Sequence, residues 1–188
     1  MKRIAIFASG SGTNAENLID YFRRHDSARV SLILCDNPQA GVLERAARLN
    51  VPAEVITRGQ LREGKALEIL QKNDIDFIVL AGFLSLVPGE LVRKYEKRIV
   101  NIHPALLPAY GGKGMYGMNV HRAVIQAGEK VSGITIHYVD EHYDRGQIVF
   151  QARTEIRPGD TPEDLAARIH VLEYEHYPHV VADLLAGR

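Results

Sequence analysis

Two polar side chains capable of chemistry stand at the end of an apolar run in the stretch IVNIHPALLPAY, residues 99–110. Asn101 and His103 are two positions apart, so in a strand they would share one face, and Pro104 follows directly. An Asn amide is a fixed neutral donor, and a protonated imidazole adds charge and moves protons near neutral pH. The pair predicts donors aimed at a developing oxyanion; the simpler alternative is a capped strand end with a hydrogen-bonded histidine.

An acidic partner for this imidazole is offered by the segment VDEHYDRGQIV, residues 139–149, which contains Asp140, Glu141 and Asp144. An imidazolium in a partly dry site needs a carboxylate beside it, and that carboxylate would raise the pKa of the histidine. The spacing alone does not select one of the three acids. A solvated acidic turn is the ordinary alternative.

A further candidate site is the stretch ASGSGTNAEN, residues 8–17. Gly10, Gly12 and Ala15 match the G-x-G-x-x-G/A pattern of dinucleotide-binding turns. Glycines let the backbone turn tightly, and the free N–H groups of a helix N-terminus hold an anion, so we predict a phosphate-binding turn. The alternative is a plain strand-to-helix turn. Asp36 would bind a ribose if the ligand were a dinucleotide, or would belong to an ordinary Asp-Asn-Pro turn.

The elements that must position these residues are predicted from hydrophobic patterning. Apolar runs at 4–9, 30–35 and 77–82 alternate with helix-like segments at 14–24, 42–50 and 61–72. This order is typical of an α/β protein with a doubly wound, mostly parallel sheet and helices on both faces. Further strands are expected at 98–103, 133–139 and 147–156, the last two able to pair antiparallel. Thr161 is expected to cap a long final helix that Pro178 kinks or interrupts.

Composition excludes several classes of protein. The 188 residues fit one domain, and 23 Lys and Arg balance 23 Asp and Glu, so there is no basic footprint for nucleic acid or a membrane surface. The single cysteine, Cys35, suits a reducing compartment, and no apolar run approaches the length of a membrane span. We expect a cytoplasmic protein with small-molecule partners, as a monomer or homodimer.

Taken together, five stretches resemble the folate-dependent glycinamide ribonucleotide transformylase family: SGSGTN, VLAGF, NIHPALLP, GITIHYVDEHYDRGQI and LEYEHYP. The resemblance covers essentially the whole chain and implies one Rossmann-like formyltransferase domain over residues 1–188. It implies transfer of a formyl group from the co-substrate 10-formyltetrahydrofolate to the amine of glycinamide ribonucleotide in purine biosynthesis, with no metal.

The resemblance also implies roles for matching residues. The catalytic set would be Asn101, His103 and Asp144. The residues expected to bind the glycinamide ribonucleotide are Gly12, Thr13, Asn14, Gly82, Ile102, Pro104, His170 and Glu173. Those expected to bind the folate are Arg62, Phe83, Leu84, Ser85, Leu86, Val87, Asn101, Val139, Asp140 and Glu141.

The chain departs from shorter relatives in the stretch GGKGMYGMNVHR, residues 111–122, whose glycines suggest a mobile flap. Five histidines form no convincing ligand cluster with Cys35, and we interpret most of them as structural or surface residues: His121, His137, His142, His176 and His179.

Three other functions compete with this interpretation. A nicotinamide-dependent oxidoreductase would use the glycine turn and Asp36, but it would leave Asn101, His103 and Asp144 unexplained. A related one-carbon enzyme, such as a deformylase or a transferase with another formyl acceptor, would share the same residues; a tRNA formyltransferase would normally need an added basic RNA-binding domain. A catalytically silent nucleotide-binding module is the third.

Overall fold

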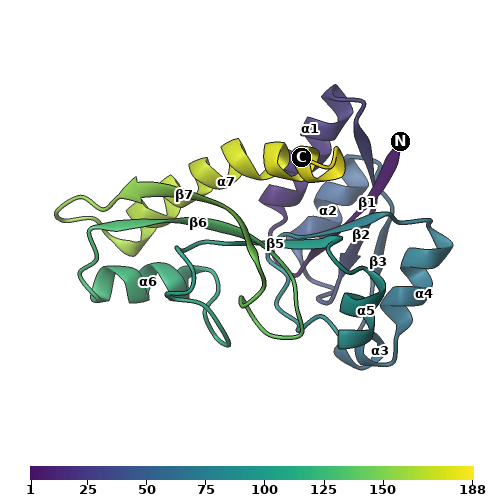
Figure 1. The fold of residues 1–188 in the computed structure, drawn as a ribbon, viewed down its shortest axis with the longest axis horizontal. Helices are drawn as coiled ribbons and strands as arrows, with labels where there is room; N and C mark the ends of the chain where they lie inside the picture. The colour runs from purple at the N-terminus through teal and green to yellow at the C-terminus, as the bar shows by residue number, and fades with distance from the viewer.

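The computed structural model describes all residues 1–188, which form one seven-stranded sheet of order β3-β2-β1-β4-β5-β6-β7 (Figure 1). The strands are β1 (Lys2–Ala8), β2 (Ala28–Cys35), β3 (Ala53–Val55), β4 (Phe77–Leu80), β5 (Ile99–His103), β6 (Val131–Tyr138) and β7 (Ile148–Glu155). Strands β1 to β5 pair in parallel, while β5–β6 and β6–β7 pair antiparallel. The predicted α/β class with a mostly parallel sheet is confirmed.

Helices cover both faces of the sheet because the strand side chains alternate between two cores. The helices are α1 (Thr13–Arg24), α2 (Gly41–Arg48), α3 (Arg58–Arg62), α4 (Lys65–Lys72), α5 (Gly89–Lys94), α6 (Met118–Gln126) and α7 (Pro162–Leu185). In β1, Ile4 and Ile6 join the core under α1, α2, α6 and α7, whereas Ala5 and Phe7 join the core under α3, α4 and α5. None of the helices is both long and apolar enough to cross a membrane.

The second face is covered unevenly, and this determines where a site can form. The even-numbered residues Val100, Ile102, Ile134 and Ile136 of β5 and β6 pack into the first core. The second core receives only Ile99 from β5 and no residue from β6. The polar side chains on that face of β5 and β6 are therefore free to face loops instead of a helix.

The shortest elements were not predicted from the sequence, and one helix that was predicted is in fact two separate helices. Helices α5 and α6 and strand β3 were not predicted, since each is too short for its periodicity to stand out. The predicted helix 61–72 breaks at Gly64, whose φ of 86° lies in the left-handed region. The end of the predicted flap is helical, because α6 begins at Met118.

The final helix begins where it was expected and does not stop at its proline. Thr161 accepts a hydrogen bond from the Asp164 backbone N–H at 3.1 Å, which confirms the predicted N-cap. The predicted interruption of the helix at Pro178 was wrong, since α7 continues to Leu185. The missing proline N–H frees the Tyr174 carbonyl, and the Asn17 side-chain amide on α1 donates to it at 3.0 Å.

Candidate active site

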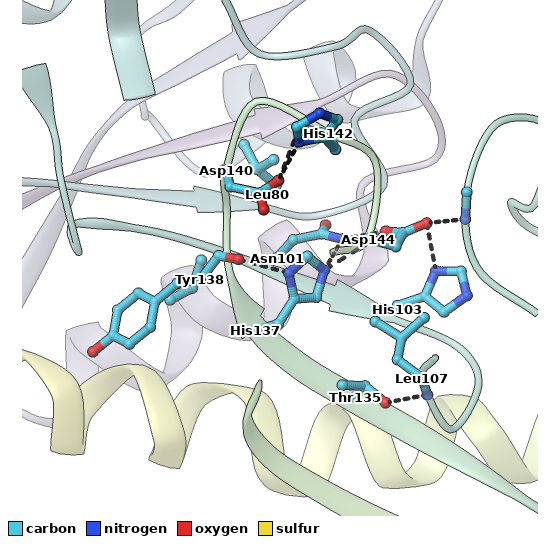
Figure 2. A network of polar contacts seen from close by, with 12 residues as sticks. Leu80, Asn101, His103, Leu107, Thr135, His137, Tyr138, Asp140, His142 and Asp144 are labelled. Carbon is cyan, nitrogen blue, oxygen red and sulfur yellow. Dashed lines mark hydrogen bonds and ion pairs between the residues drawn. The ribbon is translucent and has the colours of Figure 1, made fainter. Parts of the chain in front are cut away.

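Four side chains meet at the carboxyl end of β5 and form what we call the polar cluster: Asn101, His103, His137 and Asp144 (Figure 2). His103 Nδ1 lies 3.6 Å from Asp144 Oδ2, and Asn101 Nδ2 donates to Asp144 Oδ1 at 3.4 Å. His137 Nε2 lies 3.1 Å from Asn101 Nδ2 and 3.6 Å from Asp144 Oδ1. The structure thus brings together all three residues predicted to be catalytic and adds a fourth.

Strand pairing explains this convergence. Asn101 and His103 share one face of β5, and the antiparallel register places Asn101 opposite His137 and His103 opposite Thr135. Asp144 comes from the loop between β6 and β7, in a left-handed conformation with φ 56° that few non-glycine residues adopt. The Gly112 backbone N–H donates to its Oδ2 at 2.9 Å and helps to hold the carboxylate in place.

Burial lowers the pKa of His103, and it outweighs the neighbouring carboxylate of Asp144, which acts in the opposite direction. Asp144 does act to raise this pKa, as predicted, but burial has the larger effect because the imidazole is only 3% exposed. Its Nε2 lies 2.7 Å from the Tyr110 carbonyl oxygen, which can only accept, so Nε2 carries the proton. The ring is a neutral donor near neutral pH.

Asp144 is ionised in this setting. Burial acts to raise the pKa of the carboxyl, but His137 and His103, when they are protonated, and the Gly112 amide together hold that pKa below its usual range. A fixed negative charge thus lies against two histidines in a site where its side chain is only 11% exposed. Such a charge can stabilise a histidine that gains a proton during a reaction.

The proline loop after β5 is anchored through one buried hydroxyl. Thr135 Oγ1 donates to the Ala105 carbonyl at 2.7 Å and accepts from the Leu107 N–H at 3.0 Å. Gln151 Nε2 on β7 donates to the same hydroxyl at 2.9 Å and to the Leu107 carbonyl at 3.1 Å. The loop that leaves the polar cluster is therefore held rigidly against β6 and β7.

The predicted phosphate turn lies at the N-terminus of α1. Gly12 has φ 78°, and a Cβ there would come within 2.6 Å of Val42 on α2, so this position requires glycine. Asn14 Nδ2 donates to Glu173 Oε2 at 2.9 Å, and His170 Nδ1 lies 3.0 Å from the same oxygen. The turn and the middle of α7, predicted separately, thus meet. The Glu173 carboxylate raises the pKa of His170 through this contact.

A cavity of about 630 Å³ opens beside residues 83–87, which we call the apolar wall. Residues predicted to bind the folate that line this cavity are Arg62, Leu84, Ser85, Leu86, Val87 and Glu141. Leu84 and Leu86 are 40% and 44% exposed, so they present apolar surface into the cavity. Ser85 Oγ donates to Asp36 Oδ2 at 2.5 Å. Asp36, the acid that would bind the ribose of a dinucleotide, therefore already has a hydrogen-bond partner within the protein.

A second cavity, of about 500 Å³, adjoins the polar cluster and is lined by Leu107, Pro108, Gly111, Gly112, Tyr143, Asp144, Arg145, Gly146 and Ile148. Tyr143 lines both cavities, and its hydroxyl reaches the Leu84 carbonyl at 3.4 Å. It lies between Asp144 and the apolar wall, a position that its sequence context did not indicate.

Some predicted binding residues point away from the cavities. The Ile102 side chain is 6% exposed and lies in the core, so it does not line the site. Phe83 packs edge-on against Phe7, with ring centroids 5.2 Å apart. Val139 packs against the second core, and Asp140 Oδ1 accepts from the His142 N–H at 2.8 Å. Gly82 is the second residue after β4 and Pro104 the first after β5, both at the carboxyl edge, and Thr13 opens α1.

Two histidines interpreted as structural or surface residues belong to this region. His137 joins the polar cluster, and His121 on α6 is 3% exposed with no partner for its Nδ1. Burial lowers the pKa of His121, while Glu173 acts to raise it and His170 and His103 act to lower it. The packing of α6 against α7 brings His121 near His170 and Glu173. The β5–β6 register brings His137 to Asn101, so no local sequence signal would have found either histidine.

The described chain contains no group of three or more His, Cys, Asp or Glu side chains that could hold a metal ion. The polar cluster itself can supply hydrogen bonds, a fixed carboxylate charge and proton transfer by histidine.

Comparison with known proteins identifies the family. Residues 2–181 match the family described as Formyl transferase. The chain belongs to the formyl transferase family. This formyl transferase is 40% identical over 192 residues to a phosphoribosylglycinamide formyltransferase of Bacillus subtilis, covering 98% of this chain and 95% of the relative. It is 39% identical to the chloroplastic phosphoribosylglycinamide formyltransferase of Arabidopsis thaliana, covering the whole of this chain but only 66% of the plant protein.

Solved structures agree with this assignment. A glycinamide ribonucleotide transformylase 1 from Geobacillus kaustophilus superposes with a TM-score of 0.89 at 44% identity, covering 98% of this chain and 99% of that chain. The corresponding protein from Symbiobacterium toebii gives a TM-score of 0.92 at 36% identity, covering 100% of this chain and 89% of that chain. The expected Rossmann-like formyltransferase fold is confirmed.

Proposed function

We propose that this formyl transferase moves the formyl group of 10-formyltetrahydrofolate to the glycinamide amine of glycinamide ribonucleotide, a step of purine biosynthesis. The observation that carries the proposal is the convergence of Asn101, His103 and Asp144 at the edge of the sheet that also carries the glycine turn and the apolar wall. The names of the relatives support the choice of acceptor. We expect one catalytic domain that acts on small molecules in the cytoplasm, as a monomer or homodimer, without nucleic acid.

The reaction needs an oxyanion to be stabilised and a proton to be moved. The amine nitrogen would attack the formyl carbon, a C–N bond would form, and the carbonyl oxygen would become negatively charged. Asn101 Nδ2 and the Nε2–H of His103 are the donors for that oxygen. In the structure the Nε2–H of His103 donates to the Tyr110 carbonyl, so the oxyanion would replace that carbonyl as the acceptor.

Collapse of the tetrahedral intermediate would break the bond between the formyl carbon and N10. The attacking amine loses one proton and N10 gains one, so the proton balance closes without another reactant. The developing negative charge would offset the burial that lowers the pKa of His103, and Asp144 would stabilise the resulting imidazolium. The ionised Asp144 could also orient a water that relays the proton.

Groups far from the reacting atoms would orient the two substrates. The N–H groups at Gly12, Thr13 and Asn14 open α1 and suit a phosphate, and the Glu173 carboxylate suits ribose hydroxyls. The apolar wall would receive the pterin, and Arg62 at the rim of its cavity suits a carboxylate of the folate tail.

The test is the absorbance change of the folate product in the presence of 10-formyltetrahydrofolate and glycinamide ribonucleotide, for the wild type and for His103→Ala. We expect turnover that requires the ribonucleotide and that falls about 10²-fold to 10³-fold in the variant. Turnover without the ribonucleotide would instead indicate a deformylase. Absence of turnover in the wild type would reject the proposed acceptor or the activity itself.

A further inference from the structure

The hydrogen bonds of His137 fix which of its nitrogens carries the proton. Its Nδ1 lies 2.8 Å from the Tyr138 carbonyl oxygen, which can only accept, so Nδ1 bears the hydrogen. Its Nε2 lies 3.1 Å from Asn101 Nδ2, which can only donate, so Nε2 is a bare acceptor. The ring is 2% exposed, and water therefore does not compete for either contact.

This acceptor decides the orientation of the Asn101 amide (Figure 2). The two ends of a side-chain amide have nearly the same shape and differ only in whether they donate or accept. Asn101 Nδ2 faces the bare Nε2 of His137 and also Asp144 Oδ1 at 3.4 Å. A flipped amide would place its oxygen against two acceptors, so His137 and Asp144 select the same orientation.

The two N–H groups of Asn101 are held to different degrees. The contact with His137 is 3.1 Å long, whereas the contact with Asp144 is 3.4 Å and lies at the outer limit of a hydrogen bond. The first anchors the amide, and the second leaves an N–H that a better acceptor can take. An oxyanion formed beside Asp144 and His103 would be such an acceptor.

We propose that His137 is a positioning residue, which aims the N–H of Asn101 at the oxyanion by accepting the other N–H of the same amide. The inference rests on the proposed function and goes beyond it, since that function requires only that Asn101 donate. His137 acts through Asn101, so it should affect turnover more than substrate binding.

The experiment is a double-mutant cycle with kcat and KM measured for each protein. In His137→Asn the shorter amide can still donate to the Tyr138 carbonyl but does not reach Asn101. In His137→Gln the side-chain oxygen can take the place of Nε2. We expect His137→Asn to lower kcat about 10-fold to 100-fold with little change in KM, and His137→Gln to recover most of that loss.

The background of Asn101→Ala separates positioning from a general structural role. There, His137→Asn should lower kcat by no more than about 2-fold, because the group it positions is already gone. An equal loss in both backgrounds, or no recovery by His137→Gln, would overturn the proposal. The exposed His25, which contacts the Tyr21 carbonyl at 2.8 Å on α1, supplies the matched control His25→Gln.

A second measurement does not depend on turnover. Long-range 1H–15N spectra of the 15N-labelled wild type should show the ring proton of His137 on Nδ1, with no proton on Nε2. An Nε2–H tautomer or an imidazolium would overturn the proposal even in an active enzyme. If the wild type fails to turn over and His137 is the Nδ1–H tautomer, the proposed function fails while the positioning of Asn101 stands.

Discussion

The polar cluster and the apolar wall lie at the same edge of the sheet and are built in opposite ways. In the polar cluster, His103 and His137 are 3% and 2% exposed, and each ring nitrogen has a polar group within 3.6 Å. In the apolar wall, Leu84 and Leu86 are 40% and 44% exposed, and the same cavity is also lined by charged side chains such as Arg62 and Glu141. The side chains of the polar cluster are held in place before any substrate binds, whereas the apolar wall has exposed apolar surface that a substrate can cover.

This difference separates the two tasks of a transferase. Donors aimed at a transient charge work only if they need no rearrangement, so they are buried and held by neighbours. A wall that must accept and release a flat ring works by covering apolar area, which requires that area to be exposed beforehand. Substitutions in the first region should therefore affect kcat, and substitutions in the second should affect KM.

The largest effect should come from Asp144→Asn. The substitution removes the negative charge that faces His103 and His137 and leaves a group of nearly the same shape, so we expect kcat to fall on the order of 10³-fold. The folate-product absorbance assay measures it, with Asp74→Asn as a control whose side chain is 83% exposed. Near-normal turnover in Asp144→Asn would remove this residue from the catalytic set.

A smaller effect should come from Leu86→Asn in the apolar wall. Covering about half of a leucine side chain is worth roughly 1–1.5 kcal/mol, so the KM for the folate should rise about 10-fold with kcat nearly unchanged. The matched control is Val131→Asn, which changes a side chain of similar exposure, 41%, at the far end of β6. A loss of kcat at constant KM would contradict the division between the two regions.

Two histidines, the buried His103 and the exposed His170, should make stability depend on pH. Burial lowers the pKa of His103, so the unfolded chain binds a proton first, and stability that is complete above about pH 6.5 is lost as the pH falls below it. The pKa of His170 is raised by Glu173, so its contribution is complete below about pH 6.5 and is lost as the pH rises through the folded value.

Urea unfolding between about pH 5 and pH 8 tests both signs. The fall in the free energy of unfolding toward acid should become shallower in His103→Gln and steeper in His170→Gln. The same slope in both variants as in the wild type would show that neither imidazole titrates differently in the folded protein.

The smallest effect should come from the ion pair at the rim of the apolar wall. Arg93 Nη1 lies 2.8 Å from Glu141 Oε1, but the two side chains are 69% and 54% exposed. We expect Arg93→Gln to change the free energy of unfolding by less than about 1 kcal/mol, with the difference vanishing at high salt. A larger change that persists in high salt would mean that the rim is held as firmly as the polar cluster.

Local patterning predicted the longer elements and missed what depends on neighbours. The buried runs at β1, β2 and β4 and the cap at Thr161 follow from short-range periodicity and composition. The continuation of α7 through Pro178 could not be predicted, because its freed carbonyl is satisfied by Asn17, far away in the chain. Asp36, a candidate ribose ligand in the sequence, instead binds Ser85.

The sequence by itself determined the kind of chemistry: Asn101 and His103 at a strand end, an acidic turn at 140–144, and a glycine turn that opens a helix. Side-chain alternation and helix capping are local properties, so a single chain segment encodes them. Only the tertiary structure decided how that chemistry is tuned. The β5–β6 register placed His137 opposite Asn101, and burial lowered the pKa of His103 although the Asp144 carboxylate acts to raise it. Register and burial are properties of segments packed together, and no segment carries them alone.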